Sequence, residues 1–117
     1  MLRNLLTVLF LTSLSVLSFA QINSVQDGDW DDPNTWDCAC VPDAFAGQPI
    51  IVSNNVTITN DISLNQVQIT ATGQVTINAS VTVTLDEDFA STPLQIDVGG
   101  LLIVNGILDG GGLIISP

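Results

Sequence analysis

A run of short alternating segments between Ile50 and Ile115 limits what this chain can fold into. Apolar and polar residues alternate over a few positions, and Asn, Asp or Gly then interrupts the pattern. The segments are Val56–Thr59, Val67–Ile69, Val75–Ile77, Val81–Leu85, Leu94–Ile96 and Leu102–Val104. Val, Ile and Thr, the β-branched residues that favour strands, make up 27 of these 66 residues. The pattern predicts an all-β fold of short strands with no helix between them.

An internal repeat indicates how these strands are stacked. Residues 67–81 align with residues 94–108 at an offset of 27, although the phase at Leu101–Val104 stays open by one residue. The alignment pairs Gln68 with Gln95, Ile69 with Ile96, Gly73 with Gly100 and Asn78 with Asn105, and it matches Val81 with Leu108 in apolar character. A repeat of this length favours a solenoid, in which each coil covers the apolar face of the coil before it. A β-sandwich, which shows similar alternation, is the alternative.

Residues 1–20 have the composition of a signal peptide. Arg3 supplies a positive start, an apolar stretch follows from Leu5 to Leu17, and Ser18-Phe19-Ala20 form a small-residue cleavage site before Gln21. A membrane helix needs roughly twenty uninterrupted apolar residues, which this stretch barely approaches. We therefore expect a protein that is secreted or held at the bacterial cell surface, without membrane insertion after cleavage.

The charge of the mature chain excludes several classes of function. Cleavage after Ala20 removes Arg3, the only basic residue, and leaves 12 acidic groups and a net charge of −12 on one small domain. Nucleic acid and anionic lipid are excluded as partners because phosphate binding depends on Lys and Arg. The absence of His, Lys and Tyr removes most acid–base and nucleophilic groups. We expect no enzymatic activity.

Residues 21–49 differ in composition and contain both tryptophans. Asp32-Pro33-Asn34 is typical of a turn, and regular alternation is absent. We interpret this segment as an N-terminal cap, in which Trp30 and Trp36 cover the apolar end of the first coil. The same two rings are also candidates for a ligand-binding platform that stacks against sugars.

Cys38 and Cys40 are separated by one residue. An exported protein favours their oxidation, but a bridge across one residue requires a bent backbone to reach the usual Cα spacing. Intermolecular pairing and two free thiols remain open at this point. A metal site is less favoured, because the pair supplies only two soft ligands without a histidine.

The cap and the strands together resemble a known family. Asp29–Trp36, then Val41-Pro42, then the Val-x-Ile strands are similar to the N-terminal module of large secreted bacterial surface proteins, the eight-glycine domain, over about residues 24–112. The resemblance implies a right-handed parallel β-helix in an adhesin-like chain. Here Cys38-Ala39-Cys40 replaces glycine-rich residues. Because Ser116-Pro117 follow an apolar strand without an evident cap, we expect the coils of residues 50–117 to be incomplete and to meet further β-helix coils or a partner strand.

Two acidic segments are candidate binding sites. Asp27, Asp29 and Asp31 alternate, and oxygen-rich loops of this kind attract Ca²⁺, although a plain surface turn would have the same composition. Asp86 and Asp88 lie in the extra residues that lengthen the first copy of the repeat. Loops that project from a solenoid commonly carry binding groups, so they are candidates for a cation or a glycan. A solvated acidic turn is the alternative.

The threonines suggest a further possible surface. Thr-x-Thr occurs at Thr57/Thr59, Thr70/Thr72 and Thr82/Thr84, at offsets of 13 and 12. Stacked in successive coils, these residues would form a flat array that resembles the ice-binding face of β-solenoid antifreeze proteins. This hypothesis needs a coil of 12–13 residues.

The sequence as a whole favours a non-enzymatic structural or adhesive module outside the cell, with a glycan, a mineral or a surface protein as its partner. The alternative is a fragment of a polysaccharide-acting β-helix enzyme whose catalytic coils are absent. Paired carboxylates can hydrolyse glycosides, but no motif fixes two of them across a cleft. Lyases built on β-helices need a basic group, and none remains after cleavage.

Overall fold

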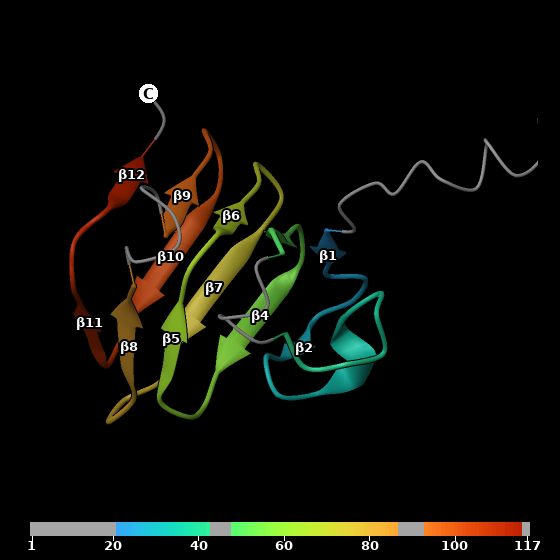
Figure 1. Cartoon of the computed structure of the whole chain (residues 1–117), viewed down its shortest axis with the longest axis horizontal. Helices are drawn as coiled ribbons and strands as arrows, with labels where there is room; N and C mark the ends of the chain where they lie inside the picture. The colour runs from blue at the N-terminus through green and yellow to red at the C-terminus, as the bar shows by residue number, and fades with distance from the viewer. Residues whose placement is uncertain (1–20, 43–47, 87–92, 116–117) are drawn as a thin grey trace, which may run out of the picture.

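The computed structural model describes residues 21–42, 48–86 and 93–115, and these residues form an all-β structure (Figure 1). The strands are β1 (Ile22–Asn23), β2 (Gly28–Asp29), β3 (Ile50–Val52), β4 (Asn55–Ile58), β5 (Ile62–Leu64), β6 (Val67–Ile69), β7 (Gln74–Ile77), β8 (Thr82–Leu85), β9 (Leu94–Ile96), β10 (Leu101–Val104), β11 (Ile107–Asp109) and β12 (Leu113–Ile115). One short helical turn, η1 (Pro33–Thr35), lies in the N-terminal segment of the described residues.

The strands form three parallel sheets. Sheet 1 has the order β1-β3-β6-β9-β12, sheet 2 the order β10-β7-β4-β2, and sheet 3 the order β11-β8-β5. From β3 onward the chain passes from sheet 1 to sheet 2 to sheet 3 and back to sheet 1, so strands that are neighbours in space are separated by a full circuit (Figure 1). The nine strand pairs of the described residues are all parallel, unlike the antiparallel pairs of a β-sandwich.

The offset of 27 is confirmed for two of the three sheets. Gln68 pairs with Gln95 in sheet 1, and Val75 pairs with Leu102 in sheet 2, which settles the phase of the second copy. The predicted match of Val81 with Leu108 is wrong, because Leu108 pairs with Val83. The turn between β10 and β11 is two residues shorter than the turn between β7 and β8, and this shifts the register of β11.

The expected threonine array does not form. Thr57 lies on β4 in sheet 2, where it pairs with Thr76, whereas Thr70 follows β6 of sheet 1 and Thr82 lies on β8 of sheet 3. Residues that pair in neighbouring strands are at least 17 positions apart in the sequence, and the smallest separation is that between Ile50 and Val67. Residues 12 or 13 positions apart therefore lie in different sheets. The prediction of a stacked Thr-x-Thr face for ice binding is wrong for this reason.

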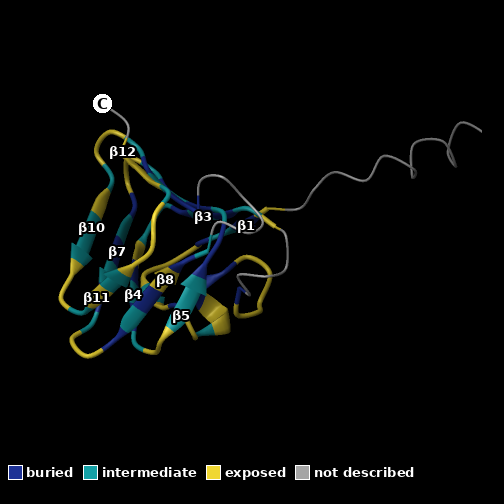
Figure 2. Cartoon of the chain, turned by 60° about the vertical axis from the view of Figure 1, so that its left-hand side comes forward, coloured by how far each residue is buried: buried dark blue, intermediate teal, exposed yellow. Residues whose placement is uncertain are grey.

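The core consists of the alternate residues that the three sheets turn inward. In β3, β6 and β9, buried residues flank one half-buried residue, as alternation in a one-sided strand predicts. Inward positions form rows across the paired strands, such as Ile50, Val67 and Leu94, which are in register and buried. Figure 2 colours the buried parts of the strands dark blue. Burial of each such side chain contributes about 1.5–3 kcal/mol to stability.

The N-terminal segment adds the first strand to two of the sheets. β1 pairs with β3 at the edge of sheet 1, and β2 pairs with β4 at the edge of sheet 2. Trp30 and Trp36 belong to the same core cluster as Ile22 and the inward residues of the coils. Among the described residues, no helix is long and apolar enough to cross a membrane.

Candidate functional site

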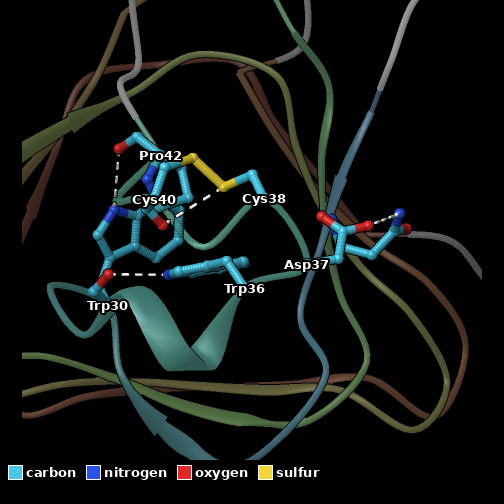
Figure 3. The surroundings of a disulfide bond; sticks show 7 residues. Trp30, Trp36, Asp37, Cys38, Cys40 and Pro42 are labelled. Carbon is cyan, nitrogen blue, oxygen red and sulfur yellow. Dashed lines mark hydrogen bonds between the residues drawn. A yellow bond between two sulfur atoms is a disulfide. The ribbon is translucent and has the colours of Figure 1, made fainter.

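The two tryptophans form a buried pair at the N-terminal end of the core (Figure 3). Their ring centroids are 4.9 Å apart in an edge-to-face arrangement with an interplanar angle of 69°. The Trp36 indole N–H donates to the Trp30 carbonyl at 2.9 Å, and the Trp30 indole N–H donates to the Pro42 carbonyl at 3.3 Å. The rings are 1% and 2% exposed, so neither indole face is open to a sugar. Their position fits the predicted covering role and not the stacking platform.

A short turn holds the tryptophans in place. The Asp32 side chain accepts a hydrogen bond from the Asn34 N–H at 2.9 Å and caps η1, which Pro33 begins. The fully buried Thr35 hydroxyl donates to the Asp29 carbonyl at 2.9 Å. A Cβ on Gly28 would lie 2.5 Å from the Thr35 hydroxyl oxygen, which explains why glycine occupies that position.

The disulfide between Cys38 and Cys40 closes the turn that follows Trp36 (Figure 3). The two Cα atoms are 5.1 Å apart, and Ala39 between them has a φ of 52°, in the left-handed region. The bent backbone that a bridge across one residue requires is therefore confirmed. No free cysteine remains in the described residues, so the two free thiols and the soft-ligand metal site considered above are not what the structure contains.

Asp37 joins the turn to β1. Its carboxylate accepts the side-chain N–H of Asn23 at 2.9 Å and the backbone N–H of Asn23 at 3.0 Å. These hydrogen bonds lower the pKa of Asp37 below its ordinary value of 3.8, because they favour the charged form. The carboxylate is thus a polar tie between the disulfide turn and the first strand of sheet 1.

The Asp37 tie predicts a pH-dependent stability difference. A carboxyl group with a lowered pKa stabilises the fold above its unfolded-state pKa, and the stabilisation disappears as the pH falls through the folded-state pKa. We expect Asp37→Asn to melt at a lower temperature than the wild type at pH 6, and we expect the gap to close below about pH 4. Thermal melts of both proteins between pH 7 and pH 2 measure this difference in melting temperature. The gap is small because Asp37 is exposed, and a gap that persists unchanged to pH 2 contradicts the assignment.

The structure does not bring Asp27, Asp29 and Asp31 together as a metal site. The Asp27 carboxylate accepts the backbone N–H of Asn55 at 2.9 Å, and the Asp31 carboxylate accepts the side-chain N–H of Asn60. Within residues 21–42, 48–86 and 93–115, no three His, Cys, Asp or Glu side chains are grouped to hold an ion. Two of the three aspartates therefore have structural partners between coils, and calcium binding here stays a prediction.

The acidic loop is only partly described. Asp86 follows β8 and its backbone N–H donates to the Leu64 carbonyl at 2.9 Å, whereas Asp88 lies outside the described residues. Eight residues separate β8 from β9, compared with two between β5 and β6, so the extra length of the first copy falls at this connection. The role of Asp86 and Asp88 in ligand binding stays a prediction.

The sequence did not predict two shallow grooves on the outside of the sheets. One has a volume of about 250 Å³ on sheet 1 and is lined by Pro49, Ile51, Gln66, Val67, Gln68 and Gln95. The other has a volume of about 280 Å³ on sheet 3 and is lined by Asp61, Ile62, Ser63, Thr82 and Thr84. The sequence did contain one signal for the first groove, because the repeat has the same residue at Gln68 and Gln95. Both residues face outward, so packing in the core does not explain why glutamine recurs.

These features define the class of protein: an all-β chain with parallel sheets, a buried tryptophan pair and shallow grooves on its outer faces. No protein-family model matches this chain, and neither does any curated protein or solved structure.

Proposed function

We propose that this chain is a non-enzymatic structural or adhesive module outside a bacterial cell, built as a right-handed parallel β-helix with an N-terminal cap. Three parallel sheets that the chain visits in turn support the helical path. Right-handed crossovers between parallel strands are strongly favoured, in about 98% of cases, which supports the handedness. Residues 1–20 support export, as argued from the sequence.

The observation that carries the proposal is a change in burial along the rows. In sheet 1, Ile50, Val67 and Leu94 are at most 2% exposed, whereas Leu113 in the last strand of the same row is 38% exposed. In the neighbouring row, Ile69 is fully buried and Ile115 is 67% exposed. In every earlier coil, the next coil covers these positions.

The last coil also ends three sheets. Among the described residues, β10, β11 and β12 are each the terminal strand of their sheet, so one edge of each has no strand paired to it there (Figure 1). Free N–H and C=O groups beside exposed apolar residues favour the addition of another strand. We propose that a further parallel β-helix coil is the partner of this end. The N-terminal end differs, because Ile22 and both tryptophans are buried there.

The test uses the protein made in a bacterial host with residues 1–20 intact. We expect to recover, outside the cytoplasm, a chain whose mass corresponds to a start at Gln21. We also expect this chain to self-associate as its concentration rises, because open edges pair with one another when no partner coil is present. Sedimentation velocity measures the association. Ile115→Asp places a charge in the inward row and should abolish it.

Ile114→Asp is the matched control for the docking end. Ile114 is the preceding residue and is also exposed, but it pairs with Gln95 in an outward row, so the charge it introduces would lie beside the contact. Association that both substitutions abolish equally, or a wild-type chain that stays monomeric at every concentration, contradicts the docking role. A chain retained in the cytoplasm with residues 1–20 uncleaved contradicts the location.

A further inference from the structure

The outer face of sheet 1 carries a straight row of side chains across the coils. Asn23, Ile51, Gln68, Gln95 and Ile114 are in register on β1, β3, β6, β9 and β12. The groove described above lies over the middle of this row, with Ile51 and Pro49 as its apolar part. Gln68 and Gln95 are half-buried and line the groove, so part of each side chain is accessible from it.

Asp97 holds both glutamines in place. The Gln68 amide N–H donates to one Asp97 carboxylate oxygen at 2.7 Å, and the Gln95 amide N–H donates to the other at 3.0 Å. A glutamine amide has two N–H donors and a carbonyl acceptor, so each side chain keeps one N–H and its oxygen for another partner. The shared carboxylate thereby orients two neighbouring amides before any ligand arrives, which reduces the entropy lost on binding.

We propose that this groove binds a neutral polysaccharide chain that runs across the strands, along the row. Each amide can donate to one sugar hydroxyl and accept from another, while Ile51 and Ile114 lie in the same row for contact with sugar C–H groups. Neighbouring strands are about 4.8 Å apart, close to the length of one pyranose unit, so successive sugars meet successive coils. The inference rests on the proposed adhesive function and assigns its ligand class and its site.

The charge of the chain selects a neutral glycan over an acidic one. The sequence contains no basic residue after Arg3, and the Asp97 carboxylate lies beside the two amides. An anionic sugar would therefore meet repulsion without a compensating cation. A neutral sugar needs only the hydrogen bonds and apolar contacts that the groove offers.

The experiment is calorimetric titration of the purified protein with cello-, laminari- and manno-oligosaccharides of one to six units, and with oligogalacturonate as the acidic counterpart. We expect at least one neutral series to bind, with an affinity that rises with length up to the span of the row. Gln68→Ala and Gln95→Ala should each weaken binding about tenfold, since each removes hydrogen bonds to the ligand.

Gln74→Ala is the matched control. Gln74 is a half-buried, outward glutamine at the start of β7, but it belongs to sheet 2, so its removal should leave the affinity unchanged. Failure of all three neutral series to bind, tighter binding of oligogalacturonate, or equal losses in the Gln74 and Gln68 variants overturns the proposal. These outcomes are separate from the export and self-association results, which test the proposed function without any sugar.

Discussion

Trp30→Ala is expected to lower the free energy of unfolding by about 3–5 kcal/mol, the largest effect of any single substitution considered for this chain. The Trp30 ring is buried at the N-terminal end of the core, and its loss opens a cavity between Trp36 and the first coil. It also leaves the Pro42 carbonyl without the indole hydrogen bond. Since domains of this size are stable by only about 5–15 kcal/mol, much of the stability disappears.

Chemical denaturation followed by circular dichroism measures the Trp30 effect, and Trp36 remains as the single fluorescent reporter. Ile114→Ala is the control, because Ile114 is a large apolar residue that is exposed on the outer face of β12. Its loss should change stability by less than about 0.5 kcal/mol. Equal effects of the two substitutions contradict a sealing role for the tryptophan.

Gly73→Ala is expected to destabilise the fold by about 3 kcal/mol, the upper part of the range for overpacking. A Cβ at this position would lie 2.1 Å from the Val52 carbonyl oxygen and 2.9 Å from its carbon, both backbone atoms. Val52 cannot move away easily, because its carbonyl also accepts the N–H of Thr70 at 2.9 Å. The backbone at Gly73 and at Val52 must therefore move apart, which weakens the strand pairing on either side of the turn.

Thr72→Ala is the control for the glycine. Thr72 is the preceding residue of the same turn and is exposed. Its hydroxyl donates to the Ser53 carbonyl at 3.2 Å and lies 3.4 Å from the Thr70 hydroxyl. Its replacement should cost about 1 kcal/mol or less. Denaturation curves of both variants give the comparison, and a glycine variant as stable as the threonine variant would show that the turn relaxes freely.

Local pattern was sufficient to predict the strands in which two buried residues flank a polar one. Val75 and Ile77, or Val67 and Ile69, flank a polar residue, and this alternation requires a half-buried strand wherever it falls in the fold. Ile62–Leu64 and Ile107–Asp109 were not singled out, because three residues with mixed polarity define no period. These two segments, β5 and β11, form strands because each pairs with β8.

The assignment of strands to sheets lay beyond local pattern. Thr57, Thr70 and Thr82 have similar neighbours in sequence, yet the turns between them carry the chain to three different sheets. The groove was missed for a related reason. Asp97 is two residues from Gln95 but meets Gln68 only through the stacking of β6 on β9, a contact that no spacing in the sequence displays.

The buried tryptophan pair and the order of strand pairing give assembly a direction. Each strand from β6 to β12 pairs with a strand that precedes it in the chain, so its template is already present when it emerges from the ribosome. Repeat structures gain stability from one neighbour at a time, which permits this stepwise growth. We therefore expect folding from the N-terminus to proceed strand by strand, without the need for a later segment.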